Sequence, residues 1–185
     1  MTFPDKQTIR REARAARDAF AAHNPIALSP PIAITDRFAP GVTVAAYLPI
    51  GSEADPAPLV AAARAAGARL ALPHVEARSA PMRFLEWREN TALVTGPFGL
   101  IQPHADALEI APDIFLTPLI AYDRTLYRLG QGAGFYDRAF ARFPDAWRVG
   151  IAWSAQEVAA VPTDPWDVPL HALLNEHEFM ERGDR

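Results

Sequence analysis

The chain contains no cysteine among its 185 residues, which excludes disulfide bonds, thiolate metal sites and cysteine nucleophiles. It also has no apolar run that approaches the length of a membrane span. Charged residues begin at Asp5, so the start of the chain is unlike a secretory signal peptide. We therefore expect a cytoplasmic protein that does not insert into a membrane.

An excess of positive charge is absent as well. The formal net charge is −4, which argues against general nucleic-acid binding. Hydrophobic residues make up 50% and charged residues 22%, as in an ordinary globular domain, and no internal repeat or low-complexity tract is present. The length suits one domain better than two. The sequence predicts a single domain over residues 1–185, with a basic helix in residues 1–20.

The first helix is predicted over residues 2–20, where Thr2 and Asp5 have the spacing of a capping box. Its apolar face is formed by Ile9, Ala13, Ala16 and Phe20. A second stripe is basic and is formed by Lys6, Arg10, Arg14 and Arg17. Such a stripe is either a solvated charged face or a surface that closes over a polyanionic ligand.

A strand–helix–strand unit follows a Pro- and Ala-rich segment, residues 21–41, which we expect to form a loop with a short helix. Residues 42–48 read as a buried strand. Asp55 and Pro56 have the pattern of a helix start, and Gly67 suits the position just after its end. Residues 69–72 are then a second strand, ended by Pro73. This order indicates a parallel βαβ unit.

Alternating elements continue to the end of the chain. We predict strands at residues 82–87, 113–121, 148–153 and 170–175, a turn at 96–99 before an extended segment, and a helix at 134–143. The 82–87 strand is expected to pair with residues 69–73 or with the segment near Leu93. The predicted fold class is α/β, a single domain with an open, mostly parallel (mixed) sheet and helices on both faces. Ligands bind such sheets beyond the carboxyl ends of the strands.

The most informative segment is residues 128–138, which read Arg-Leu-Gly-Gln-Gly-Ala-Gly-Phe-Tyr-Asp-Arg. Alternate glycines permit positive φ and a close approach of backbone N–H groups to anionic oxygens, and the following helix adds its dipole. Arg128 and Arg138 flank the loop as phosphate partners, and Asp137 is placed to hold a divalent cation. No Lys follows as in a P-loop, and the dinucleotide fingerprint is incomplete. The alternative is a glycine-rich turn that only joins a strand to a helix.

Together with other segments in a fixed order, this loop resembles the 5-formyltetrahydrofolate cyclo-ligase family, also called methenyltetrahydrofolate synthetases. The resemblance covers nearly the whole chain. The loop is specific by itself, whereas the other segments are weak singly and strong as a series. The matching segments are residues 6–10, 47–49, 53–55, 72–73, 82–84, 99–103, 118–123, 128–138 and 156–176.

The resemblance implies an ATP- and Mg²⁺-dependent enzyme that converts 5-formyltetrahydrofolate to 5,10-methenyltetrahydrofolate and releases ADP and phosphate. The γ-phosphoryl group of ATP would activate the formyl oxygen, and N10 of the folate would then close onto the formyl carbon. Such enzymes act mainly by positioning and by stabilising charge on the transferred phosphoryl group. The expected partners are small molecules only, bound by a cytoplasmic monomer, with no nucleic acid and no membrane.

The resemblance also assigns roles to residues. ATP would be bound by Lys6, Arg10, Arg128, Leu129, Gly130, Gln131, Gly132, Ala133, Gly134, Phe135 and Tyr136. The folate substrate would contact Leu48, Glu53, Gln131, Phe135 and Tyr136. Arg128 and Tyr136 would act in catalysis, and Asp137 and Asp167 would hold Mg²⁺, a hard cation that prefers carboxylate ligands.

Each assignment has a structural alternative. Glu53 is otherwise a surface acid before a helix, Asp167 a turn residue, and Tyr136 a ring packed on the sheet. The chain also has Leu126 and Trp166 where the family usually has Gly and His, Pro56 in place of Thr and Phe135 in place of a frequent Tyr.

Other functions also remain open. A non-catalytic folate- or nucleotide-binding relative would require Leu126 and Trp166 to block the ATP or metal geometry. An enzyme acting on phosphosugars or coenzyme A would need its own acid–base pair or glutamate nucleophile, which no motif supplies.

Overall fold

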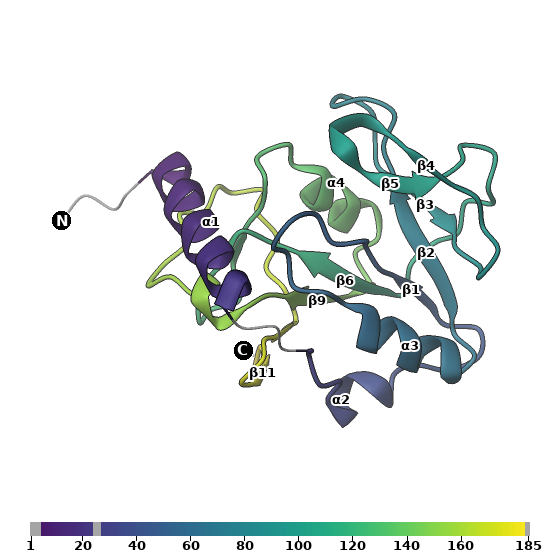
Figure 1. The fold of residues 1–185 in the computed structure, drawn as a ribbon, viewed down its shortest axis with the longest axis horizontal. Helices are drawn as coiled ribbons and strands as arrows, with labels where there is room; N and C mark the ends of the chain where they lie inside the picture. The colour runs from purple at the N-terminus through teal and green to yellow at the C-terminus, as the bar shows by residue number, and fades with distance from the viewer. Residues whose placement is uncertain (1–4, 24–26, 184–185) are drawn as a thin grey trace.

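The computed structural model describes residues 5–23 and 27–183. At its centre a seven-stranded sheet has the order β11-β10-β9-β6-β1-β2-β3 (Figure 1). The five inner strands are parallel, and the two edge strands are antiparallel to their neighbours. The strands, in that order, are Phe179–Glu181, Ala172–Leu174, Trp147–Ile151, Ile114–Pro118, Thr43–Ala45, Arg69–His74 and Arg83–Glu86. The mostly parallel mixed sheet predicted from the sequence is confirmed.

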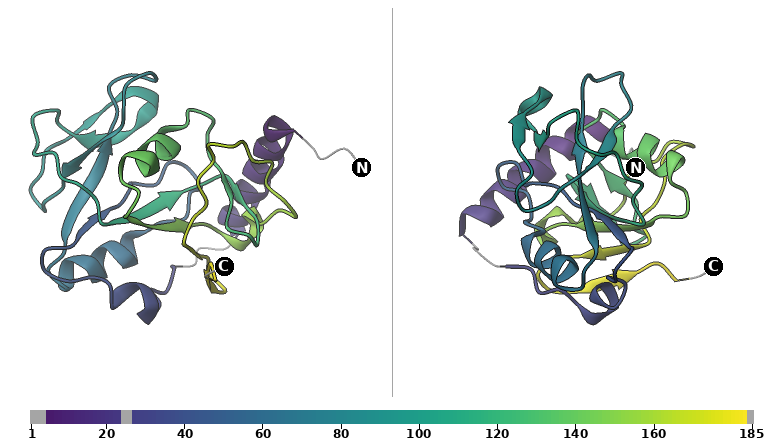
Figure 2. Two further views of the ribbon diagram at one scale, coloured as in Figure 1. Left: turned by 180° about the vertical axis from the view of Figure 1, so that it is seen from behind. Right: turned by 90° about the vertical axis from the view of Figure 1, so that its right-hand side faces the viewer.

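Helices cover both faces of this sheet, as predicted (Figures 1 and 2). On one face lie α2 (Ile32–Thr35) and α3 (Ala57–Ala65), and on the other lies α4 (Phe135–Arg142). Successive residues of β1 and β6 point to opposite faces, as strand geometry requires. Val44 and Leu116 join the core under α3, whereas Ala45 and Phe115 join the core under α4.

The remaining elements lie at the ends of the sheet. Helix α1 (Lys6–His23) contacts η2 (Ser154–Gln156) and β7 (Ala121–Tyr122) at one end of the molecule. Two short antiparallel ribbons are formed by β4 (Leu93–Thr95) with β5 (Ile101–Pro103), and by β7 (Ala121–Tyr122) with β8 (Arg128–Leu129). The turn η1 (Pro97–Gly99) connects β4 to β5, as the sequence predicts. No helix in the described residues is long and apolar enough to cross a membrane.

Helix α1 differs from its prediction in two respects. Its first turn is capped by Asp5, whose carboxylate accepts hydrogen bonds from the N–H groups of Gln7 and Thr8 at 2.7 and 3.0 Å, while Thr2 lies outside the described residues. The buried face consists of Ile9, Ala13 and Arg17, and Ala16 is exposed. Arg17 is therefore not part of a solvated face, one of the two alternatives for the basic stripe, because its side chain packs against the loop after β1.

The βαβ unit formed by β1, α3 and β2 is confirmed as parallel. Asp55 accepts a hydrogen bond from the Ala57 N–H at 2.9 Å, and Gly67 ends the helix with φ +77°. Pro73 does not end β2 but lies within it, opposite Phe84 of β3. Since β1 stops at Ala45, β2 has no partner on that side at Pro73, and the missing N–H is tolerated there.

Other predicted strands had approximate bounds. The strand at residues 42–48 is only Thr43–Ala45, after which the chain leaves the sheet, and the strand at 113–121 is divided between β6 and β7. Strand β3 pairs with β2 rather than with the segment near Leu93, and β11 was not predicted.

The strand order places a crevice at one edge of the sheet. After β1 the chain moves outward to β2, and after β6 it moves in the opposite direction to β9, although β1 and β6 are neighbours. The connections that follow β1 and β6 therefore diverge, and they leave a space beyond the carboxyl ends of these two strands.

Candidate active site

A cavity of about 600 Å³ occupies this space. Tyr47 and Leu48 reach it from the end of β1, and Pro118 and Leu119 from the end of β6. The site residues that the family resemblance assigns all line it. They are Lys6, Arg10, Leu48, Glu53, Arg128, Leu129, Gly130, Gln131, Gly132, Ala133, Gly134, Phe135, Tyr136, Asp137 and Asp167. The structure thus brings four distant segments to one place, while the role of each residue stays a prediction.

The glycine loop has the backbone conformation that its sequence suggests. Gly132 and Gly134 have φ +96° and +66°, a region that side chains disfavour, whereas Gly130 has an ordinary φ. Gly134 is the residue before the first turn of α4, so the N-terminal end of that helix meets the cavity. A helix N-terminus with adjacent glycine N–H groups is a favourable environment for phosphate oxygens.

Three arginines from different elements hold the carbonyl groups of this loop. Arg10 of α1 donates to the Gly130 carbonyl at 2.8 Å, and Arg78 after β2 donates to the Gly132 carbonyl at 3.5 Å. Arg138 donates to the Ala133 carbonyl at 2.9 Å. Arg138 does not line the cavity, so its predicted place beside a phosphate is wrong and it braces the loop from outside.

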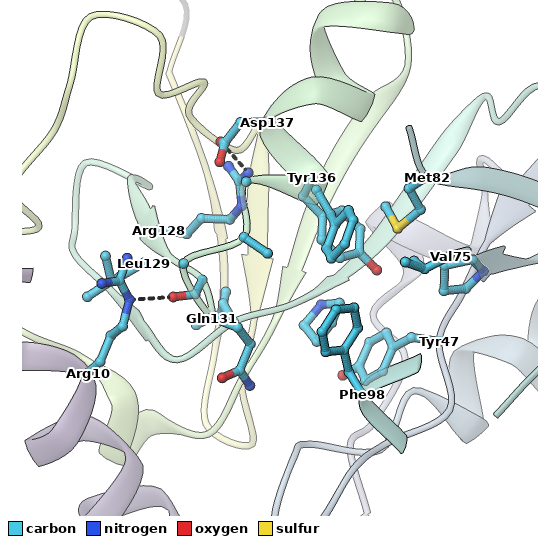
Figure 3. A pocket seen from close by; sticks show the side chains of 18 of the residues that line it. Arg10, Tyr47, Val75, Met82, Phe98, Arg128, Leu129, Gln131, Tyr136 and Asp137 are labelled. Atoms are coloured by element: carbon cyan, nitrogen blue, oxygen red, sulfur yellow. Dashed lines mark hydrogen bonds and ion pairs between the residues drawn. The ribbon is translucent and has the colours of Figure 1, made fainter. Parts of the chain in front are cut away.

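Arg128, which is nearly buried, forms an ion pair beside the loop with Asp137, which is partly exposed (Figure 3). Arg128 Nη2 lies 2.6 Å from Asp137 Oδ1, Nη1 donates to the Val168 carbonyl at 2.7 Å, and the guanidinium stacks over the Phe140 ring. Burial lowers the pKa of Arg128, and the charge of Asp137 opposes that shift. Because arginine titrates far above neutral pH, it still provides a fixed positive charge at the cavity wall.

Lys6 forms a second charged cluster with two carboxylates. Its Nζ lies 2.7 Å from Asp164 Oδ2 and 2.8 Å from Asp167 Oδ2. Burial opposes the charge of Lys6, but the hydrogen bonds to both carboxylates outweigh it and raise the pKa of Lys6. Burial likewise opposes ionisation of Asp167, yet the bond from Lys6 brings the pKa of Asp167 below its usual value. Both partners are therefore charged near neutral pH.

The carboxylates fit a magnesium ion only in part. Within the described residues, no group of three or more His, Asp or Glu side chains gathers to hold a metal. Asp137 and Asp167 face the same cavity but are engaged by Arg128 and Lys6 respectively. Mg²⁺ commonly takes one or two carboxylates together with substrate phosphates, so this donor set suits an ion that enters with a nucleotide.

The other half of the cavity is aromatic. In Figure 3 the rings of Tyr47, Phe98 and Tyr136 face the same space as Val75 and Met82, away from Arg10 and Arg128. The Tyr47 hydroxyl donates to the Ala54 carbonyl. Burial, reinforced by the charge of Glu53, raises the pKa of Tyr136 far above neutral. Tyr136 is therefore a neutral phenol, able to donate a hydrogen bond.

Glu53 lies at the wall of the aromatic half, with its side chain 10% exposed. Its Oε2 accepts the Ile50 N–H at 3.0 Å, and its Oε1 lies 3.7 Å from Arg17 Nη1. Burial raises the pKa of Glu53, and the Ile50 N–H and the Arg17 charge both act against that rise.

The two unusual residues of the sequence leave the cavity intact. Leu126 has φ +62°, the left-handed region that a glycine would occupy, and its amide and carbonyl bond Asp123 and Leu170 at 2.9 Å each. The turn that leads into the glycine loop therefore forms with leucine at this position. Trp166 is 70% exposed at the cavity margin, so its ring stands mostly in solvent.

The cavity residues that sequence reasoning missed include Arg78, Phe98 and Asp164. Asp164 lies three residues before Asp167, and its N–H donates to the Asp167 carboxylate at 2.8 Å, so the spacing of the two acids was a usable signal. Phe98 lies in the turn that the sequence predicted. Arg78 had no local signal, because only the fold brings it to the glycine loop.

Comparisons with known proteins agree with the family resemblance of the sequence. The sequence model of the 5-formyltetrahydrofolate cyclo-ligase family matches residues 3–176. The chain is 34% identical over 146 residues to the 5-formyltetrahydrofolate cyclo-ligase of Escherichia coli (strain K12), covering 75% of this chain and 80% of that protein. The protein of the same name from Mycolicibacterium smegmatis is 34% identical over 143 residues, 72% of this chain and 73% of its own length.

Solved structures show the same similarity. The NMR structure of Aquifex aeolicus 5,10-methenyltetrahydrofolate synthetase has a TM-score of 0.74 and 25% identity, covering 97% of this chain and 94% of that one. The Mycoplasma pneumoniae synthetase has the same fold, with a TM-score of 0.68, 24% identity, and coverage of 94% and 100%. This chain therefore belongs to the 5-formyltetrahydrofolate cyclo-ligase family of ligases.

Proposed function

We propose that the protein uses ATP and Mg²⁺ to convert 5-formyltetrahydrofolate to 5,10-methenyltetrahydrofolate, with release of ADP and phosphate. The observation that carries this proposal is the division of one cavity into a cationic half and an aromatic half. The glycine loop borders the first, Glu53 borders the second, and Arg128 and Tyr136 lie near enough for each to influence the pKa of the other.

The cationic half suits the triphosphate of ATP. Lys6 and Arg10 approach from α1, Arg128 comes from β8, and residues 130–134 supply glycine N–H groups and the start of α4. Helix N-termini and arginine side chains bind phosphate oxygens strongly. Asp137 and Asp167 are the residues that would hold Mg²⁺, which would neutralise charge on the phosphates when bound.

The aromatic half suits the folate ring system. Leu48, Phe135 and Tyr136 offer flat or apolar contacts, and Glu53 is a carboxylate acceptor for the amino groups of the pterin. Gln131 lies between the two halves, where its side chain bonds Glu53 and accepts from Arg14 at 2.6 Å. A planar, amphipathic ligand with ring N–H donors fits such a wall.

The proposed chemistry has two steps. The formyl oxygen forms a bond to the γ-phosphorus of ATP, and the bond from that phosphorus to ADP breaks. N10 then bonds the formyl carbon and loses its proton, and the C–O bond to phosphate breaks to give the methenyl bridge. Arg128 stabilises charge on the transferred phosphoryl group, and the neutral Tyr136 donates a hydrogen bond rather than acting as a base.

The test is the near-UV absorbance of purified protein incubated with 5-formyltetrahydrofolate and MgATP. We expect the methenyl chromophore to appear only when folate, ATP and Mg²⁺ are all present. Folded protein that yields no chromophore in the complete mixture would reject the proposal. It would then favour a relative that binds folate or nucleotide without catalysis.

A further inference from the structure

Arg17 is the one arginine of α1 that turns away from solvent and from the glycine loop. Its side chain is only 6% exposed, whereas Arg11 on the same helix has a side chain 72% exposed. Arg17 packs against the loop after β1, which contains Ser52 and Glu53. Its position therefore connects α1 to the aromatic half of the cavity.

The Arg17 guanidinium is only partly hydrogen-bonded. Its Nε donates to Ser52 Oγ at 2.9 Å and lies 3.9 Å from Asp18 Oδ1. Its Nη1 is buried and has no hydrogen-bond partner among the described residues, but it lies 3.7 Å from Glu53 Oε1. That atom is thus directed at a carboxylate that forms part of the cavity wall.

Stability alone is a poor reason for this arrangement. Burying an arginine with an unsatisfied N–H is unfavourable, and replacing a buried ion pair by apolar side chains is often neutral or stabilising. The loop has other anchors, since Trp153 Nε1 donates to the Ser52 carbonyl at 3.0 Å and Tyr47 bonds the Ala54 carbonyl. The feature left to explain is the positive charge beside Glu53.

We propose that Arg17 is a positioning residue for the folate substrate, which holds the Glu53 carboxylate in place and in its ionised form. The inference rests on the proposed function and extends it, because it makes α1 serve both halves of the cavity. Lys6 and Arg10 at the start of the helix would serve ATP, and Arg17 two turns later would act on folate through Glu53.

The electrostatic surroundings of Glu53 set the direction of the effect. The groups that face it are Arg17 from α1, Tyr47 after β1 and Tyr136 from α4, and both tyrosines are neutral near pH 7. The Ile50 N–H and the Gln131 side chain act against the effect of burial on the pKa of Glu53, and within the part of the chain that the structure describes Arg17 is the one charged group that does so. An opposite charge within 4–6 Å typically lowers a carboxyl pKa by about 1–3 units.

The experiment compares wild type with Arg17→Met, measuring equilibrium binding of 5-formyltetrahydrofolate between pH 5 and 8. Without Arg17, Glu53 takes up its proton at higher pH. The pH below which folate binding weakens should therefore rise by about one pH unit or more. At pH 6 the loss of affinity should be roughly tenfold, as for losing a charged hydrogen-bond partner. ATP affinity should stay within about twofold.

Matched variants separate this effect from a change of fold. Arg11→Met removes an exposed charge from the same helix and should bind folate like wild type. Arg17→Lys keeps the positive charge and should keep the wild-type pH dependence of folate binding. If Arg17→Met does not fold, Arg17→Gln removes the charge while offering Ser52 an amide donor, and the same prediction applies.

A double variant tests the route through Glu53. In a Glu53→Gln background, Arg17→Met should weaken folate binding no further, and independent losses that multiply would overturn the inference. The same pH dependence of folate binding in wild type and in Arg17→Met would also overturn it. Wild-type protein that binds no 5-formyltetrahydrofolate would instead reject the proposed function itself, so the two failures are distinguishable.

Discussion

Leu126 is a residue whose side chain and backbone make opposite contributions to stability. Its φ of +62° is unfavourable for any residue with a Cβ, by about 1 kcal/mol. Its side chain, however, is only 2% exposed and packs in the core beneath α4. Burial of a leucine contributes about 2–3 kcal/mol, which exceeds the backbone strain and explains why a leucine is tolerated where glycine would fit better.

We therefore predict an unusual order of stability at this position. Leu126→Ala loses the core contacts and keeps the strain, whereas Leu126→Gly loses the contacts and relieves the strain. Both variants should be less stable than wild type, by about 2–4 kcal/mol, and the glycine variant should be the more stable of the two by about 1 kcal/mol. Urea denaturation measures the order, and an alanine variant as stable as the glycine variant would show that the strain is negligible.

Asp137 is the ion-pair partner of Arg128 in the structure, and in the proposed function it is also a ligand for Mg²⁺. Asp137→Asn should abolish ATP-dependent turnover if the metal assignment is correct. It should also reduce stability by about 1–2 kcal/mol, because Arg128 is nearly buried but Asn can still accept one of its hydrogen bonds. Turnover and denaturation are measured on the same preparation. Full activity in a less stable protein would reject the metal role and leave the ion pair.

At the scale of elements, the glycine loop connects β8 to α4 through two residues in the left-handed region. Gly134→Ala forces a Cβ into φ +66° and places it 3.3 Å from Arg138 Nη1. The variant should lose about 1 kcal/mol of stability and bind ATP more weakly. Gly130→Ala is the matched control for stability, because its φ is ordinary and nothing lies within 4 Å of the added atom. Equal stabilities of the two variants would contradict the claim that the loop needs its positive φ.

The order and type of most elements were predictable because periodicity and helix-end signals are local. The βαβ unit, the helix after the glycine loop and the parallel core all followed from such patterns. Strand β11 was not predicted, because its three residues form an edge strand only through pairing with β10. The continuation of β2 through Pro73 depends on where β1 stops, which no local pattern records.

In the candidate site too, local patterns predicted some residues, whereas others depend on contacts between distant segments. Loop residues 128–137 were identified because their chemistry is contiguous in the sequence, and Glu53 and Asp167 because a family resemblance supplied them. The burial of Arg17 was not predicted, because a helical stripe of basic residues is usually solvated and the burial depends on Ser52, far along the chain. Contacts between distant segments are a property of the fold, which sequence patterns describe only indirectly.

At the scale of the whole molecule, α1 closes one side of the cavity with modest apolar contact. Ile9 and Ala13 pack on a small cluster formed by Ile120, Ala121, Leu129 and Val161. Polar contacts from Lys6, Arg10 and Arg14 to distant segments supplement this packing. A ligand that binds α1 and the glycine loop together should therefore reduce any motion that separates them.

Hydrogen exchange with and without MgATP tests this expectation. At a ligand concentration about 100 times the Kd, openings that release α1 become about 100-fold rarer, so amides of residues 9–13 should exchange up to that much more slowly. Arg10→Met should weaken the protection because it removes a proposed phosphate contact, whereas Arg11→Met should preserve it because that side chain is exposed and away from the cavity. If saturating MgATP slowed exchange in the glycine loop but not in α1, Lys6 and Arg10 would not bind ATP. The helix would then be a fixed wall rather than part of the nucleotide site.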